Sequence, residues 1–182
     1  NKVLKDIIFF TDKYIYFNEL QMNGYVSNFF RISKEVKTKE MMFVCNDMES
    51  YSNIKREEEW HRAYLEQLPS TFGGAFPTPE EWAVFVKVAW YHTKDNHLDV
   101  IDDKLYYFDH FNSKILTYDE GMNLLNECEI TYPTKEDFWQ HKIYKDKALG
   151  KFYTIFGSTV NEIDVMTGKT SAVANANQWL TE

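Results

Sequence analysis

The stretch from residue 103 to residue 122 constrains the fold more than any other part of the sequence, because strand-forming and turn-forming residues alternate in it. Leu105–Phe108 is an aromatic and branched run of strand length, Asp109–Ser113 supplies turn residues, and Lys114–Tyr118 alternates polar and apolar side chains. Asp119, Glu120 and Gly121 then form a second turn signal. The stretch predicts two short antiparallel strands, each closed by a turn.

Strings related to this stretch recur elsewhere in the chain. Asp12–Asn18 and Gly150–Phe156 resemble Asp103–Asp109, and the three strings start 91 and 47 residues apart. Because 91 is close to twice 47, the strings fit a register of roughly 45 residues with one degenerate copy in the gap, which is the length of a four-stranded propeller blade. Hairpin follows hairpin without a crossover helix. We therefore predict an all-β fold of antiparallel β-propeller blades in a single domain over residues 1–182.

A charged segment interrupts the repeats. From residue 53 to residue 68 the composition favours a helix, and Trp60, Tyr64 and Leu68 follow one another at four-residue spacing, with Ala63 beside them on the same face. We expect a short amphipathic helical insert over 53–68 that ends before Pro69.

A second helix signal is brief. Thr78 is placed as a cap, Pro79 as the first helical residue and Glu81 as the side chain that reaches back to the cap. Val84, Val86 and Val88 then alternate with other residues, so we predict a strand over residues 83–91 after at most one helical turn.

The segment from Phe108 to Leu124 resembles an NHL-type repeat, whose loose consensus is an Asp, an Asn, a basic residue, an Ile, an aromatic residue, an Asp and a Gly. The residues in these places are Asp109, Asn112, Lys114, Ile115, Tyr118, Asp119 and Gly121. Asn161–Lys169 likewise resembles the strand and turn of other propeller repeats, in which an Ile-Asp pair precedes a Thr-Gly turn. More broadly, the arrangement is similar to six-bladed propeller lipoproteins of bacterial cell envelopes.

The resemblance implies a binding module in the bacterial cell envelope or periplasm. Propellers close with about four to eight blades, whereas this chain has room for three, or for four if the degenerate copy counts. The expectation is that the chain is a fragment of a longer propeller, or that two copies complete one ring as a homodimer.

Composition excludes several classes of function. The chain has 182 residues, of which 44% are hydrophobic, so one domain with a sizeable core is expected. The formal net charge of −8 offers no surface that would follow a phosphate backbone, so no nucleic acid is expected as a partner. No apolar stretch is long enough to cross a bilayer. Cys45 and Cys128 lack the spacing of a structural metal site, and we expect them to be small buried hydrophobic residues or, after export, a disulfide. No metal and no cofactor is expected.

The richest polar cluster offers candidate catalytic residues. His92, His97 and Asp99 lie within eight residues of one another, and imidazoles and a carboxylate on one loop could act as acid and base. The five-residue spacing of the two histidines fits no regular face, and no metal-binding motif accompanies them. A polar loop that leads into a strand at Leu98 is the competing interpretation.

Aromatic residues make up 17% of the chain. An exposed group could stack on sugars or anchor a peptide, and we take the following residues as candidates for ligand binding: Trp82, Trp90, Tyr91 and Trp139. The competing interpretation is that they fill the spaces between blades.

We predict a non-enzymatic module that binds a protein or a glycan. One alternative is a propeller hydrolase or lyase that acts on a polysaccharide through His92, His97 and Asp99. The other is a compact α+β interaction or immunity-like protein in which residues 53–90 are mainly helical and pack on one sheet.

Overall fold

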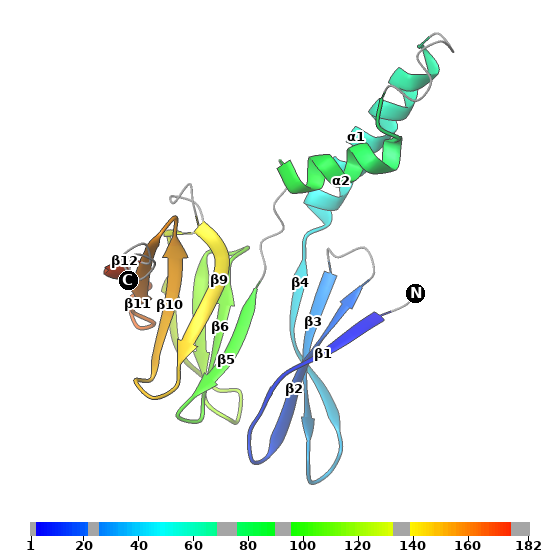
Figure 1. Cartoon of the computed structure of the whole chain (residues 1–182). Helices are drawn as coiled ribbons and strands as arrows, with labels where there is room; N and C mark the ends of the chain where they lie inside the picture. Colours follow the sequence, from blue (N-terminus) through cyan, green and yellow to red (C-terminus); the bar gives the residue numbers. More distant parts are fainter. Residues whose placement is uncertain (1–2, 22–25, 69–75, 90–95, 133–138, 176–182) are drawn as a thin grey trace, which may run out of the picture. The chain divides into compact units, whose positions relative to one another are not determined.

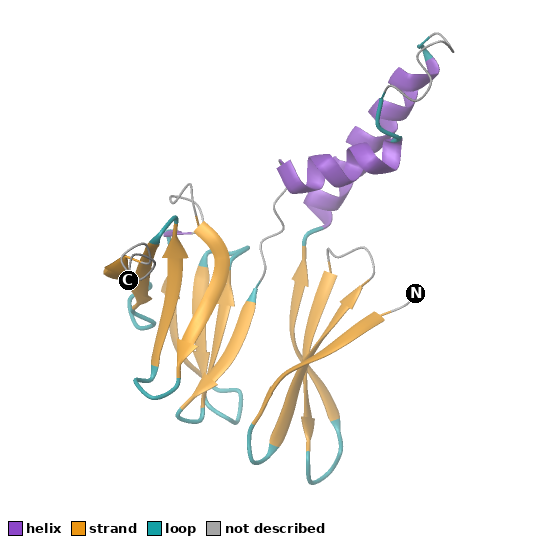
Figure 2. Cartoon of the chain, in the orientation of Figure 1, coloured by secondary structure: helices purple, strands orange, loops and turns teal. Residues whose placement is uncertain are grey.

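A computed structural model describes residues 3–21, 26–68, 76–89, 96–132 and 139–175 (Figures 1 and 2). The chain divides into two compact units, Asn1–Thr93 and Lys94–Glu182. The described residues are mainly β, in agreement with the predicted antiparallel strands, and they contain two helices. They form no closed propeller.

The first unit contains one four-stranded antiparallel sheet in the order β1-β2-β3-β4. Its strands are β1 (Val3–Phe10), β2 (Tyr14–Gln21), β3 (Val26–Ser33) and β4 (Lys39–Asn46). Each strand pairs with the next one in the sequence, so the sheet is a simple meander.

The second unit contains two more meanders of the same kind. The second sheet consists of β5 (His97–Ile101), β6 (Lys104–Asp109), β7 (Lys114–Tyr118) and β8 (Leu124–Glu129). The third sheet consists of β9 (Trp139–Asp146), β10 (Lys151–Phe156), β11 (Thr159–Ile163) and β12 (Thr170–Asn175). The three strings that recur in the sequence include β2, β6 and β10, each the second strand of its sheet, so the recurring string marks the same strand in all three sheets.

The last turn of each meander is also built alike. A side-chain oxygen at the end of the third strand accepts a hydrogen bond from a backbone N–H of the turn: Ser33 Oγ from Val36 N (3.3 Å), Asp119 Oδ1 from Asn123 N (2.8 Å) and Asp164 Oδ1 from Met166 N (2.9 Å). Each turn also contains one residue with positive φ: Lys37, Met122 and Gly168, respectively. The repeat therefore extends from strand order to turn chemistry.

A helical pair, α1 (Met48–Glu66) and α2 (Pro79–Ala89), occupies the gap where the spacing predicts a degenerate copy. The predicted helix over 53–68 is present but begins earlier, at Met48, where Asp47 Oδ1 accepts a hydrogen bond from Ser50 N. The helices contact each other through Ile54 and Val86, both buried.

The strand predicted over residues 83–91 is wrong where the structure describes it, because residues 83–89 belong to α2. Alternating valines suit a strand, but the cap at Thr78 starts a helix, and Val86 gains its burial by packing on α1. Tertiary packing thus overrides the weak local preference.

The two faces of each meander can be told apart from the strand registers. We name as the A face the side that carries Ile15 and Phe17 in the first sheet, Tyr106 and Phe108 in the second, and Tyr153 and Ile155 in the third. The B face is the opposite side, with Tyr14 and Tyr16, Leu105 and Tyr107, and Phe152 and Thr154.

In the second unit, the A face of the second sheet packs on the B face of the third sheet. Phe108 and Tyr106 each place their ring 5.1 Å from the ring of Phe152, and Ile115 and Ile143 belong to the same buried core. The two sheets therefore use different faces, as successive members of a stacked series do.

The strand pairing is irregular only where an edge strand takes part. Register shifts occur in the pairs β1–β2, β3–β4, β7–β8, β9–β10 and β11–β12, which all include an edge strand. The central pairs β2–β3, β6–β7 and β10–β11 are regular.

Candidate functional site

Two of the predicted catalytic residues lie together at the start of β5. His97 Nε2 and Asp99 Oδ2 are 3.6 Å apart, which is longer than a hydrogen bond. Both residues lie on the A face of the second sheet, which packs on the third sheet. His92, the third member of the predicted set, falls outside the described residues.

Asp99 is already engaged by a cation from the neighbouring sheet. Lys145 Nζ on β9 donates a short hydrogen bond to Asp99 Oδ1, and the backbone N–H of Val100 donates to the same oxygen at 2.8 Å. Burial raises the pKa of Asp99, but the neighbouring His97 and Lys145 outweigh this effect, and the pKa falls below its usual value. Asp99 is thus a carboxylate that links two sheets.

The predicted aromatic ligand-binding residues lie in different places. Trp139 is only 6% exposed and belongs to the core of the second unit, where its Nε1 donates a hydrogen bond to Thr154 Oγ1 at 2.7 Å. Trp82 lies on α2 in the first unit and is partly buried. Trp90 and Tyr91 fall outside the described residues.

Trp139 is part of a buried polar cluster. His110 is fully buried, its Nε2 lies 3.0 Å from Tyr132 Oη, and its ring meets the Trp139 ring edge-on at 4.6 Å. Asn96 Oδ1 accepts a hydrogen bond from His110 N at 2.9 Å, and Asn96 Nδ2 donates to Tyr107 Oη at 2.6 Å. Burial raises the pKa of Tyr132 far above its usual range, so its hydroxyl keeps its proton. These groups satisfy one another, which indicates a structural role.

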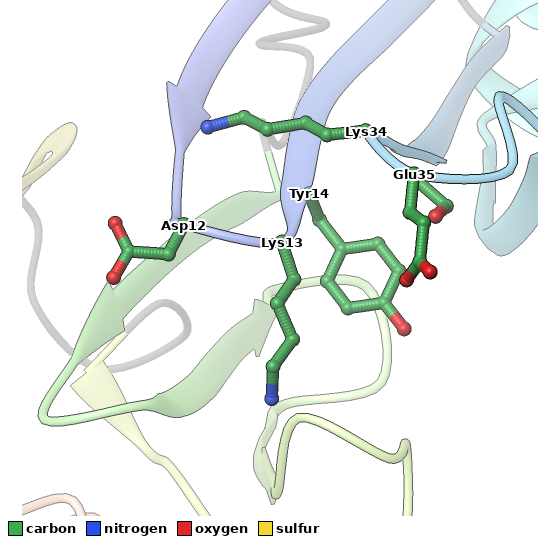
Figure 3. Close-up of a pocket in the computed structure, with 6 residues that line it drawn as sticks. Asp12, Lys13, Tyr14, Lys34 and Glu35 are labelled. Carbon is green, nitrogen blue, oxygen red and sulfur yellow. The ribbon is translucent and has the colours of Figure 1, made fainter.

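A pocket of about 430 Å³ lies between the β1–β2 and β3–β4 turns of the first unit (Figure 3). It is lined by Asp12, Lys13, Tyr14, Ser33, Lys34 and Glu35. Lys34 Nζ donates a short hydrogen bond to Thr11 O, and Lys34 N donates to Lys13 O at 2.9 Å, so part of its polar lining holds the two turns together. Two acidic and two basic residues give the pocket no charge preference.

The helical pair carries a group of exposed aromatic residues. We name as the hairpin aromatic surface the residues Trp60, Tyr64, Phe76 and Phe85. Trp60 is 59% exposed, and its ring stacks on that of Tyr64 with centroids 5.8 Å apart and planes 9° apart. The Phe76 ring meets Tyr64 edge-on at 6.1 Å.

A buried layer supports this surface. His61 is buried between the helices, its ring stacks on Trp82 at 4.9 Å, and its Nε2 lies 2.8 Å from Pro77 O. Trp82 in turn contacts the Phe85 ring at 5.4 Å. The His61 ring also lies 6.3 Å from the Tyr64 ring, so a chain of ring contacts runs from Trp60 and Tyr64 on α1 to Phe85 on α2.

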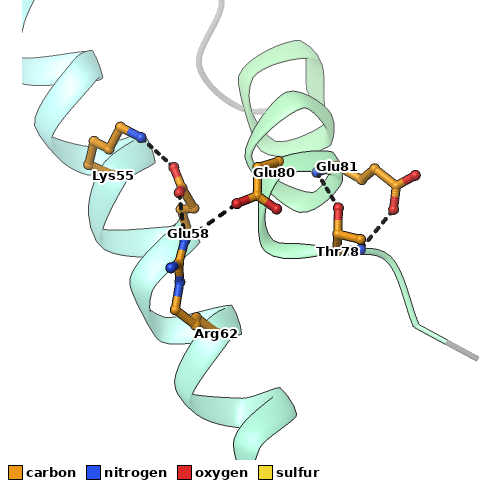
Figure 4. A network of polar contacts seen from close by, with 6 residues as sticks. All are labelled: Lys55, Glu58, Arg62, Thr78, Glu80 and Glu81. Atoms are coloured by element: carbon orange, nitrogen blue, oxygen red, sulfur yellow. Dashed lines mark hydrogen bonds and ion pairs between the residues drawn. The ribbon is translucent and has the colours of Figure 1, made fainter. Parts of the chain in front are cut away.

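Charged groups form a network on α1 that reaches α2 (Figure 4). Glu58 on α1 accepts from Lys55 at 2.5 Å and from Arg62 at 3.2 Å, and Arg62 reaches Glu80 on α2 at 3.4 Å. At the start of α2, Thr78 Oγ1 accepts from Glu81 N at 3.2 Å and Glu81 Oε2 accepts from Thr78 N at 2.8 Å, which confirms the predicted cap.

The apolar face that the sequence predicts for this helix, with Trp60 and Tyr64, is not its buried face. The buried residues of α1 are Ile54 and His61, which lie seven positions, or two helical turns, apart. The seven-residue spacing of Ile54 and His61 is present in the sequence. A choice of the buried face by apolar character alone favours Trp60 and Tyr64 instead.

Among the described residues, no group of three or more His, Cys, Asp or Glu side chains could hold a metal ion. No helix within the described ranges has the length and apolar character needed to span a membrane. Comparison with protein-family models, curated proteins and solved structures found no match to this chain.

Proposed function

We propose that this protein is a non-enzymatic binding module that holds a protein ligand on its hairpin aromatic surface. The observation that carries the proposal is the exposure of Trp60 and its neighbours on a helical pair that is rigidly connected beneath them. Tryptophan and tyrosine are enriched at the energetic centres of protein interfaces, because they bury much area and lose little conformational entropy.

The ring geometry favours a protein over a glycan. A sugar-binding platform presents the flat faces of its rings to solvent, whereas Trp60 and Tyr64 turn faces toward each other and Phe76 covers part of Tyr64. The rings present exposed edges to solvent, and Val84 on α2 is exposed as well. Such a surface suits apolar side chains of a protein partner.

The propeller architecture and the envelope location are part of the same proposal. Three meanders with equivalent turns, and the packing of an A face on a B face in the second unit, support an architecture of stacked blades. The location in a bacterial envelope rests on the resemblance to propeller lipoproteins.

The test is to compare capture by three immobilised chains: the wild type, the double variant Trp60→Ser/Phe85→Ser, and the control Val36→Ser, which changes an exposed apolar residue of the β3–β4 turn. From a bacterial envelope extract, we expect the wild type and the control to retain the same protein and the double variant to lose it. The retained protein, once purified, should bind the double variant at least about tenfold more weakly in calorimetry.

Equal capture by all three chains would refute the role of the hairpin aromatic surface. A polysaccharide that binds the wild type and the control, but not the double variant, would replace the protein ligand by a glycan.

A further inference from the structure

The first sheet leaves apolar side chains exposed on one of its faces. Its exposed large hydrophobic residues within the described strands are Ile7 (72%), Phe10 (75%), Met41 (57%) and Val44 (53%). The registers place all four on the A face, because Ile7 pairs with Phe17, Phe10 with Ile15, Met41 with Phe30 and Val44 with Asn28. At the centre of the sheet, side chains of both faces are buried: Phe17 and Phe30 on the A face, and Tyr16, Phe29 and Cys45 on the B face.

The centre of this A face holds two stacked aromatic rings and one ion pair. Phe17 and Phe30 stack with centroids 5.4 Å apart, and Lys39 Nζ lies 3.7 Å from the centre of the Phe30 ring. Lys39 also forms an ion pair with Glu19 at 2.6 Å. The registers place Lys5 on the same face as this pair, so the face is not acidic on a chain whose net charge is −8.

The equivalent face in the second unit shows what such a surface accepts. There the A face of the second sheet is covered by another four-stranded meander. A second copy of this chain offers such a meander. Phe152 on the B face of the third sheet is packed in the core of the second unit. The largest group of exposed hydrophobic side chains on the described strands lies on an A face.

Among the three A faces, that of the first sheet carries the most exposed large hydrophobic residues. The A face of the third sheet carries charged Lys151 and Glu162 beside the half-exposed Tyr144, whereas that of the first sheet has four exposed aliphatic and aromatic side chains. Pairing two first sheets through a two-fold axis covers the largest group of exposed hydrophobic side chains and uses the commonest symmetry of protein dimers.

The area is sufficient for a weak dimer. Four strands of eight residues form the sheet, and strand spacings of about 4.8 Å with a rise of about 3.3 Å per residue give a face of about 500 Å². Two faces bury about 1,000 Å² in total, close to the smallest area of a specific interface.

We infer that a second copy of this chain docks on the A face of the first sheet, so that two chains associate face to face through Ile7, Phe10, Met41 and Val44. Because the interface is small, the association should depend on concentration in the micromolar range.

Sedimentation velocity over a concentration series tests this inference. The wild type should pass from one to two chains per particle as concentration rises. Phe10→Glu and Met41→Glu should each stay monomeric, because each places two buried like charges in the interface. Val36→Glu and Leu149→Glu, which add the same charge at exposed turn positions, should dimerise like the wild type.

A mixed sample makes the test independent of folding defects. Met41→Glu and Met41→Lys should each be monomeric alone and should associate when mixed, and circular dichroism should match that of the wild type. A wild type that stays monomeric at every concentration, or a dimer that survives Phe10→Glu and Met41→Glu, would overturn the inference. Trp60→Ser/Phe85→Ser should leave the dimer intact, so the outcome is separate from that of the proposed ligand site.

Discussion

Trp139 Nε1 donates a hydrogen bond to Thr154 Oγ1 at 2.7 Å across the β9–β10 pair, and the same hydroxyl donates to Lys142 O at 3.0 Å. Thr154 is fully buried. One threonine hydroxyl therefore serves both an indole and a backbone carbonyl inside the core of the second unit.

Thr154→Val should destabilise the protein by about 1–3 kcal/mol, because the indole loses this acceptor and the carbonyl loses a donor in a site without water access. Urea unfolding followed by tryptophan fluorescence measures the change. Thr154→Ser keeps the hydroxyl and should cost less. Equal losses in the two variants would show that the methyl group, and not the hydrogen bond, matters.

The stability of the second unit should depend on pH through Asp99. Because the pKa of Asp99 is lower in the folded chain than its usual value of 3.8, its contacts stabilise the fold above pH 3.8. This contribution disappears as the pH falls through the lowered pKa. Asp99→Asn should therefore lose less free energy of unfolding than the wild type between about pH 6 and about pH 2.

Lys145→Gln removes the ammonium group that contacts Asp99. It should therefore also reduce the loss of free energy of unfolding between about pH 6 and about pH 2. The measurement is urea unfolding at a series of pH values. Parallel profiles for the wild type and both variants would contradict the role of this ion pair.

The cap of α2 gives a prediction for the helical pair. Thr78→Ala removes the acceptor for Glu81 N and should destabilise the first unit by about 1 kcal/mol. Thr78→Ser keeps the oxygen and should stay near the wild type. Far-ultraviolet circular dichroism during thermal unfolding measures the difference, and identical midpoints for both variants would contradict the role of the cap.

Gly168 and Gly150 form a matched pair of turn glycines. Both have positive φ (71° and 65°), but a Cβ at Gly168 would lie 1.9 Å from Glu129 O, whereas a Cβ at Gly150 would have its nearest neighbour at 3.6 Å. Gly150→Ala should cost about 1 kcal/mol from backbone strain alone. Gly168→Ala should cost more than about 4 kcal/mol, because the β11–β12 turn must move away from β8.

The free energy of unfolding in urea compares the two glycine variants. If both lose the same amount, the close approach of Gly168 to Glu129 O does not constrain the turn.

The repeats can be predicted from the sequence because they depend on local residue patterns. The string Asp12–Asn18 and its two relatives each combine a polar turn with an aromatic strand, so the three second strands were visible without any tertiary information. The cap at Thr78 was visible for the same reason. Such signals act over a few residues, which is the range that a sequence pattern reports.

The errors concern tertiary packing. Val84, Val86 and Val88 alternate as in a strand, yet Val86 reaches Ile54 only because α1 lies beside α2. The sequence marks Trp60 and Tyr64 as the apolar face of the first helix, yet the buried residues of that helix are Ile54 and His61. Whether an aromatic residue is buried depends on its distant neighbours, and this also explains why Trp139 could not be distinguished from an exposed ligand-binding residue.

The register shifts at the sheet edges restrict how this protein can assemble. A regular edge strand is a template on which further strands add without limit, as in amyloid fibrils. Here most pairs that contain an edge strand are interrupted, while the central pairs are regular. Ribbon-like polymerisation through backbone hydrogen bonds is thus discouraged, and association is directed to side-chain surfaces, where two chains can close on each other and growth stops.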